Sequence, residues 1–259
     1  MVLHNRSELA GAKRVVVKVG SSSISGANEH KIEKLVDALA AAHRNGQEVI
    51  LVTSGAIATG MPLLGLESKP DDLATSQALA SVGQGRLISR YQTSLERFNI
   101  IAGQVLLTAG DLEAAETSEN AKRAMQRLLE LRVIPIVNEN DTVATAEIRF
   151  GDNDRLAALV AVLVEADALI LLSDVDSLYD MPPTKPGAKR IETVAFGSEL
   201  EDVEIGGSGS AVGTGGAVTK VSAAKVATEQ GVAVLLTSSD LVSEALQGNN
   251  VGTWFEAKG

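Results

Sequence analysis

A chain of 259 residues with 45% hydrophobic residues is long enough to bury a sizeable core, as one large or two small domains. The absence of cysteine excludes disulfides, cysteine-ligated zinc and a thiol nucleophile. A net charge of −10 and an aromatic content of 3% argue against a surface that binds nucleic acid or an anionic membrane.

The few histidines and the chain's apolar stretches narrow the class of protein further. His4, His30 and His43 stand beside no other candidate ligand, so we expect solvated surface histidines rather than metal ligands or a catalytic triad. The first residues lack a signal-peptide pattern, and the apolar stretch 156–172 is interrupted by Glu165 and Asp167, too soon for a membrane span. We therefore expect a soluble, cytoplasmic protein that binds neither membranes nor nucleic acid.

The predicted elements alternate between strands and helices along the chain. In order, they are a strand at 14–19, a helix at 29–45, a strand at 48–52, a long helix at 73–97, a strand at 100–107, a helix at 120–131, a strand at 133–137, a helix at 154–165, a strand at 168–172, a loop-to-helix transition at 215–230 and a strand at 232–236. A break of the long helix near Gly83 and Gly85 is left open. Most strands are uniformly apolar, which predicts a mainly parallel sheet covered on both faces. Residues 181–216 are rich in glycine and proline and predict a loop-rich segment, either a lid or a nucleotide-facing region.

Small and polar residues follow four of these strands. These residues are Lys18 with the glycine and serines after it, Ser54 and Gly55, Asp152 to Asp154, and Ser173 with Asp174. In a parallel sheet these junctions converge on one edge, where helix N-termini offer unpaired N–H groups to anions. Glycine there lets the backbone approach a phosphate closely.

The densest polar cluster is Val-Asn-Glu-Asn-Asp-Thr at 137–142, followed by Gly-Asp-Asn-Asp at 151–154. Carboxylates and carboxamides gathered where a buried strand ends are typical of a ligand site in an α/β protein. The alternative is a turn rich in Asx residues that has no function.

Two lysines deserve separate interpretation. Lys18 interrupts an apolar strand, and because an unpaired buried charge is costly, it either snorkels at the strand end or faces an anion. Lys220 ends the glycine-rich run 213–220, which either cradles phosphate or is a flexible loop before a helix. No standard nucleotide-binding fingerprint is present.

Taken together, these segments resemble the amino acid kinase family and, within it, the glutamate 5-kinases. The resemblance rests on residues 17–22, 52–58, 82–85, 104–108, 137–144, 151–154, 172–174 and 213–220, which come in the family's order and span nearly the whole chain. It implies a three-layer αβα sandwich around a mainly parallel sheet of roughly eight strands, in a single domain covering residues 1–259. It also implies ATP-dependent phosphorylation of the γ-carboxylate of L-glutamate, the first step of proline biosynthesis. Many members carry a further C-terminal PUA domain, and we expect a short form without it.

The resemblance implies roles for particular residues. The catalytic group would be Lys18 and Lys220, which bind phosphate in the transition state, and Asp154, which organises both lysines. Glutamate would be bound by Ser54, Gly55, Asp141, Asp152 and Asn153, with Asp141 on its ammonium group. ATP would be bound by Ser173, Asp174, Thr214, Gly215, Gly216, Ala217, Val218, Thr219 and Lys220. Two departures are Ser173, where threonine is common, and Ser177, where glycine is common.

The resemblance also implies ligands and partners. ATP would enter with Mg²⁺ bound mainly through its phosphates, without dedicated metal ligands from the protein. We further expect feedback inhibition by proline at a site overlapping the glutamate pocket, transfer of the product to glutamyl-phosphate reductase, and a homo-oligomer, either a dimer or a tetramer. Competing hypotheses are a related acceptor (acetylglutamate, aspartate or UMP) and an amino-acid sensor without turnover.

Overall fold

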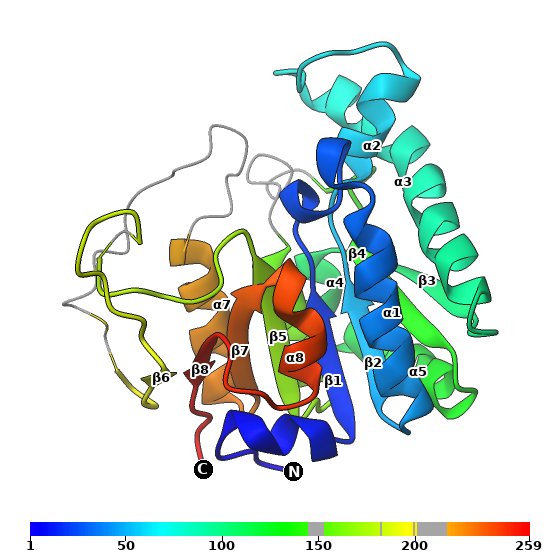
Figure 1. The fold of residues 1–259 in the computed structure, drawn as a ribbon. Coiled ribbons are helices and arrows are strands. Elements are labelled where there is room, and N and C mark those ends of the chain that lie inside the picture. Colours follow the sequence, from blue (N-terminus) through cyan, green and yellow to red (C-terminus); the bar gives the residue numbers. More distant parts are fainter. Residues whose placement is uncertain (145–152, 182, 199, 201–216) are drawn as a thin grey trace.

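The computed structural model describes residues 1–144, 153–181, 183–198, 200 and 217–259. Within these residues the chain forms one sheet in the order β3-β4-β2-β1-β5-β7-β8-β6 (Figure 1). Neighbouring strands in this part of the chain run parallel, except for the antiparallel pair β7 and β8. The prediction of a mainly parallel, roughly eight-stranded sheet is confirmed.

The strands and helices have the following bounds. The strands are β1 (Arg14–Lys18), β2 (Glu48–Val52), β3 (Ala102–Leu107), β4 (Ile134–Glu139), β5 (Ala168–Ser173), β6 (Thr193–Val194), β7 (Ala233–Ser238) and β8 (Thr253–Phe255). The helices are α1 (Lys31–Arg44), α2 (Ala56–Leu63), α3 (Leu73–Glu96), α4 (Ala109–Glu113), α5 (Ala115–Glu130), α6 (Asp154–Leu163), α7 (Ala217–Glu229) and α8 (Val242–Leu246). Among the described helices, none is long and apolar enough to cross a membrane.

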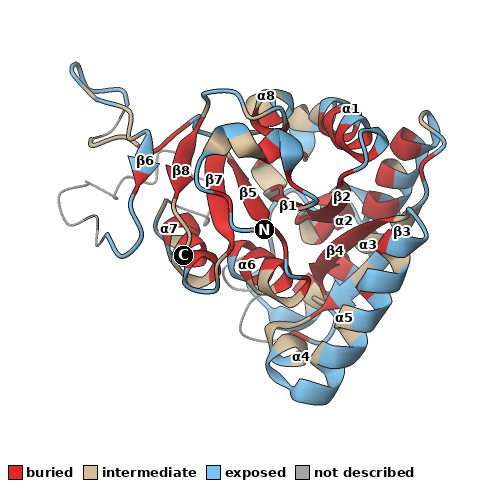
Figure 2. Cartoon of the chain, turned by 90° about the horizontal axis from the view of Figure 1, so that it is seen from below, coloured by how far each residue is buried: buried red, intermediate tan, exposed pale blue. Residues whose placement is uncertain are grey.

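The helices cover both faces of the sheet and enclose two hydrophobic cores. Figure 2 shows the buried strands between α1 and α8 on one side and α6 and α7 on the other. Side chains alternate between the faces, so Val15 and Val17 of β1 belong to one core and Val16 to the other. Because both faces are dry, the strands are uniformly apolar, and the result is a three-layer αβα sandwich.

Helix α3 is continuous, so the alternative of a break near Gly83 and Gly85 is wrong. Gly83 serves a close helix contact instead. A Cβ atom at Gly83 would lie 1.9 Å from the carbonyl oxygen of Ala56, and one at Gly60 would lie 2.1 Å from that of Leu79. These two glycines therefore let α2 pack directly against the backbone of α3, in the hairpin that projects at the upper right of Figure 1.

The structure differs from the sequence-based expectations in several elements. Strand β4 continues past residue 137 and includes Asn138 and Glu139. The short strands β6, at the edge of the sheet, and β8, beside it, were not predicted, because two or three residues are too few to show a period. His43 is buried rather than solvated; burial, followed by the charge of Arg132, lowers its pKa.

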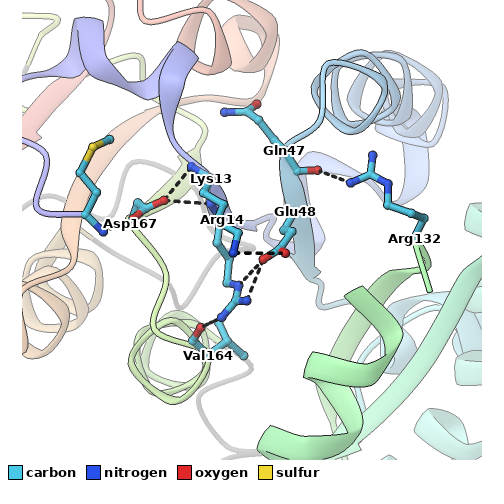
Figure 3. A network of polar contacts seen from close by, with 8 residues as sticks. Lys13, Arg14, Gln47, Glu48, Arg132, Val164 and Asp167 are labelled. Atoms are coloured by element: carbon cyan, nitrogen blue, oxygen red, sulfur yellow. Dashed lines mark hydrogen bonds and ion pairs between the residues drawn. The ribbon is translucent and has the colours of Figure 1, made fainter. Parts of the chain in front are cut away.

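The amino ends of the central strands are held by a polar network (Figure 3). The Asp167 carboxylate accepts hydrogen bonds from the backbone N–H groups of Lys13 (2.7 Å) and Arg14 (2.9 Å) and pairs with the N-terminal ammonium group at 2.5 Å. The Arg14 guanidinium in turn pairs with Glu48 at 2.7 Å. Burial alone would raise the pKa of Asp167, but these donors outweigh it and lower that pKa below its usual range.

We expect Asp167→Ala to lower the free energy of unfolding by roughly 1–2 kcal/mol at neutral pH, since it leaves two partly buried N–H donors without their acceptor. Asp167→Asn should cost less, because its carboxamide oxygen can still accept from both. A carboxyl group whose pKa is lower in the folded state stabilises the protein above the unfolded pKa of about 3.9, and this contribution disappears as pH falls through the folded pKa. Urea unfolding of the three proteins at pH 7 and at pH 3 measures both effects. Equal stability of wild type and Asp167→Ala at pH 7 would contradict this role.

Candidate active site

The polar residues singled out in the sequence meet at the carboxyl edge of the sheet, opposite the Asp167 network. Strands β1, β2 and β5 run parallel and end there at Lys18, Val52 and Ser173. Helices α2 and α6 begin at the same edge, the upper one in Figure 1. The expected convergence of the strand-to-loop junctions is therefore observed.

The centre of this edge is a buried carboxylate held by two lysines. Lys18 Nζ lies 2.5 Å from Asp154 Oδ1, and Lys220 Nζ lies 3.0 Å from Asp154 Oδ2. Thr219 also donates its hydroxyl to Asp154 Oδ2 at 3.0 Å. Asp154 is the first residue of α6, where the helix dipole favours a negative charge. The structure thus brings together the three residues predicted to be catalytic.

The burial of these three side chains decides between the two interpretations of Lys18. Lys18 is 1% exposed, Lys220 5% and Asp154 0%. Snorkelling to water is therefore wrong for Lys18, and the anion that it faces within the chain is Asp154. In this trio two buried ammonium groups face one carboxylate.

The predicted acceptor residues Ser54, Gly55 and Asn153 lie next to this cluster. Ser54 is 3% exposed, and among the described residues its hydroxyl has no hydrogen-bond partner. A buried hydroxyl without a partner is rare and indicates a place for a ligand atom. Gly55 adopts φ = 99°, a left-handed conformation that favours glycine, and directly precedes α2.

Asn153 is anchored by its side-chain nitrogen. Asn153 Nδ2 donates to the backbone oxygen of Thr53 at 2.6 Å and to Asn138 Oδ1 at 2.8 Å. This use of both N–H groups leaves Oδ1 as the atom that Asn153 can present to a ligand. Asn153 also precedes Asp154 at the start of α6, so the same contacts help to place the carboxylate that holds the lysines.

Asp141 lies beyond the end of β4, and the pKa of its carboxyl group is above the usual range. Burial raises the pKa of its carboxyl group to about 6, and the positive charge of Lys69 opposes that rise. Asp141 lines a small hollow together with Ala80, Gln84, Leu106, Glu139, Asn140 and Thr142. A carboxylate in such a place can pair with a cationic group of a ligand.

The predicted ATP residues lie on the other side of the cluster. Asp174 accepts hydrogen bonds from the hydroxyls of Ser22 (3.1 and 3.2 Å) and Ser23 (3.3 Å), which joins the loop after β1 to the loop after β5. Ser173 ends β5, and Ala217, Val218 and Thr219 open α7. Asp152, Thr214, Gly215 and Gly216, also predicted site residues, lie outside the described residues.

Sequence reasoning gave no role to several residues that support the site. Asn138 connects Asn153 to Gln84 of α3, whose Oε1 it approaches at 2.6 Å. The Tyr91 hydroxyl lies 2.8 Å from Thr53 Oγ1, and burial raises the pKa of Tyr91. A polar residue inside an apolar strand, as Asn138 is, was the available signal.

A parallel sheet with two buried lysines on one carboxylate at its carboxyl edge is the arrangement of a protein that binds an anionic ligand there. The model of the amino acid kinase family matches residues 13–238, and the chain belongs to this family. It is 68% identical over 251 residues to a glutamate 5-kinase of Clavibacter sepedonicus, covering 97% of each chain. It is 64% identical over 256 residues to a glutamate 5-kinase of Leifsonia xyli subsp. xyli, covering 98% of this chain and 95% of the relative. Among solved structures, carbamate kinase from Giardia lamblia bound to AMP-PNP shares the fold, with a TM-score of 0.68 and 16% identity over 96% of this chain and 100% of that one.

We expect Asp154→Ala to lower the free energy of unfolding by about 3–5 kcal/mol, because it leaves the ammonium groups of Lys18 and Lys220 buried without their carboxylate. Adding Lys18→Met and Lys220→Met should restore most of that stability, since the triple variant buries no charge at these positions. Urea unfolding of the single and triple variants at pH 7 provides the measurement. A triple variant no more stable than Asp154→Ala would show that the loss has another origin.

Proposed function

We propose that this protein transfers the γ-phosphoryl group of ATP to the γ-carboxylate of L-glutamate, giving L-glutamyl 5-phosphate and ADP, the first step of proline biosynthesis. The observation that carries the proposal is the cluster of Lys18, Asp154 and Lys220 at the carboxyl edge of the sheet. The relatives named glutamate 5-kinase, similar over nearly their whole length, support the same reaction.

The reaction needs positive charges that stabilise the transferring phosphoryl group, and it needs no general base. A glutamate γ-carboxylate has a pKa of about 4.3 and is ionised near neutrality, so one of its oxygens can attack the γ-phosphorus directly. The new P–O bond forms as the bond to the β–γ bridging oxygen breaks, and that oxygen leaves with ADP. The difficulty is to bring two anions together and to stabilise the charge on the transferring group, which positioned cations do.

Lys18 and Lys220 would supply those cations. Both ammonium groups contact opposite oxygens of one carboxylate, so they are held close together despite their mutual repulsion. Asp154 is then a positioning residue: it fixes the lysines so that a phosphoryl group beside them meets charges that are already in place. Such preorganised charge is the largest single contribution in many phosphoryl-transfer sites.

The acceptor would be oriented by residues on the α2 and β4 side. Asp141 pairs with the ammonium group of glutamate, and Asn153 Oδ1 and the Ser54 hydroxyl supply further hydrogen bonds. Gly55 and Asp152 complete this proposed site. The supporting observations are the hydroxyl of Ser54, which has no partner in the part of the chain that the structure describes, and the anchored nitrogen of Asn153.

ATP would lie between Ser173 and Asp174 on one side and residues 214–220 on the other. Mg²⁺ requires octahedral oxygen ligands and keeps several waters, and it would supply neutralisation of the phosphate charge. The described residues hold no group of three or more histidine, aspartate or glutamate side chains arranged for a metal. We propose that the ion arrives with ATP and is held mainly by its phosphates.

The remaining proposals concern regulation and assembly. We place the reaction in the cytoplasm, in a single amino acid kinase domain that assembles into a dimer or tetramer. Proline inhibits by binding across the glutamate pocket, and the labile acyl phosphate passes to glutamyl-phosphate reductase. These follow from the proposed reaction and the family.

The reaction itself is tested by ADP release with Mg-ATP against glutamate, aspartate, acetylglutamate and UMP. We expect turnover with glutamate, and with hydroxylamine present we expect the γ-hydroxamate that an acyl phosphate forms. Turnover with another acceptor only would move the function to that acceptor, and ATP binding without turnover would favour a sensor.

We expect Lys18→Ala and Lys220→Ala each to lower kcat by at least roughly 100-fold, the effect of losing a preorganised charge contact. Lys34→Ala, on the exposed face of α1, is the matched control and should leave kcat unchanged. Steady-state kinetics with saturating ATP and glutamate measure the change. Near wild-type turnover in both site variants would remove these lysines from the mechanism.

The raised pKa of Asp141 predicts a pH dependence. Only its ionised form attracts an ammonium group, so kcat/KM for glutamate should rise with pH through an apparent pKa of about 6. The γ-carboxyl group of glutamate titrates lower, at about 4.3, and does not obscure this step. Asp141→Asn should abolish the step and raise the KM for glutamate far more than that for ATP. A profile that keeps its step in Asp141→Asn would assign the titration to another group.

A further inference from the structure

Three carboxamide side chains form a continuous hydrogen-bonded chain from the end of β2 to α3. Asn153 Nδ2 donates to the backbone oxygen of Thr53 (2.6 Å) and to Asn138 Oδ1 (2.8 Å). Asn138 Nδ2 then donates to Gln84 Oε1 at 2.6 Å. We call Asn153, Asn138 and Gln84 the amide relay. Asn138 is 1% exposed and Asn153 7%, so water cannot easily replace these bonds.

The direction of the amide relay is determined by its first contact. A backbone carbonyl oxygen can only accept, so the atom of Asn153 that faces Thr53 must be the nitrogen. That nitrogen also faces Asn138, which must therefore present its oxygen there and its nitrogen to Gln84. Reversing any one amide would place two oxygens or two NH₂ groups against each other. Gln84 consequently gives its oxygen to Asn138 and keeps the N–H groups of Nε2 for another partner.

Gln84 lines the same hollow as Asp141. The hollow has a volume of about 10 Å³, so it holds one small polar group of a ligand, and the neighbouring groups of that ligand would lie at its open side. Its lining combines Gln84 of α3, whose Nε2 the relay leaves as a donor, with the acidic residues Asp141 and Glu139. A hydrogen-bond donor beside a carboxylate matches the two groups on the α-carbon of an amino acid, which are a carboxylate and an ammonium group.

The amide relay also indicates which end of the acceptor lies near the lysines and which end lies near Gln84. Asn153, at one end, adjoins Asp154 and therefore the lysine cluster, where the γ-carboxylate must react. Gln84 stands at the other end, two side chains further from the lysines. The part of the acceptor most distant from its reacting carboxylate therefore falls beside Gln84.

We propose that Gln84 determines acceptor specificity by donating a hydrogen bond from Nε2 to the α-carboxylate of the substrate. This proposal rests on the proposed glutamate kinase activity and adds a residue to its acceptor site. This role explains why Gln84, on a surface helix, is hydrogen-bonded to a buried network. Because its oxygen accepts from Asn138, the group that remains for the ligand is an N–H donor.

Gln84→Glu tests the proposal with little disturbance of the relay, because one carboxylate oxygen can still accept from Asn138. Its second oxygen faces the hollow and repels an α-carboxylate. The paired substrates are glutamate and isoglutamine, in which a neutral carboxamide replaces the α-carboxylate while the ammonium group and the γ-carboxylate remain. Gln92→Met, on an exposed position of the same helix, is the control and should change neither substrate.

We expect Gln84→Glu to lower kcat/KM for glutamate by about 100-fold and to raise it for isoglutamine, so that the preference of the wild type is reversed. A folded Gln84→Glu variant, judged by an unchanged melting temperature, that keeps the wild-type preference or turns over neither substrate overturns the proposal. If that variant does not fold, Gln84→Met replaces it, with a loss of at least about tenfold expected for glutamate and little change for isoglutamine; equal losses for both substrates refute the role. Absence of glutamate turnover in the wild type would instead refute the proposed reaction.

Discussion

The carboxyl edge of the sheet depends on one buried carboxylate that holds two ammonium groups. Asp154 connects Lys18, from the first strand, with Lys220, from a helix late in the chain, so segments distant in sequence are fixed at one point. Burying three charged side chains is costly even when they are paired, and apolar residues of similar size would be as stable or more so. Stability alone does not explain the cluster, whereas the proposed phosphoryl transfer needs fixed positive charge at this edge.

The polar groups at the two edges of the sheet differ in whether they have partners within the protein. At the amino edge, Asp167 and Arg14 direct their charges to partners within the protein, which include backbone N–H groups, the N-terminus and Glu48. At the carboxyl edge, the Ser54 hydroxyl is buried without a partner among the described residues, and burial raises the pKa of the Asp141 carboxyl group to about 6. The first arrangement stabilises strand order, and the second is suited to binding and release of a ligand.

The sequence predicted the architecture well because the physical causes are local. Uniformly apolar strands indicated a parallel sheet with two covered faces, and strand-to-loop junctions in such a sheet must meet at one edge. Composition and periodicity could not show the partner of Lys18, since Asp154 approaches it only after folding, and only the family resemblance pointed to this pair. Gly83 was read as a possible helix break, although the backbone of α2 occupies the space beside it. Strands β6 and β8 were too short to detect, and the orientation of the amides is a property of their contacts alone.

Strand register connects the fold to the amide relay. Val52 of β2 pairs with Val137 of β4, and the Thr53 N–H donates to the oxygen of Val137 at 2.9 Å. The next residues, Thr53 and Asn138, therefore end up beside each other, where Asn153 can bond to both. A slip of one residue would turn Asn138 to the opposite face of the sheet and break the relay. The apolar residues that set the register of β2 and β4 thus also determine that Gln84 gives its oxygen to Asn138 and keeps its nitrogen for another partner.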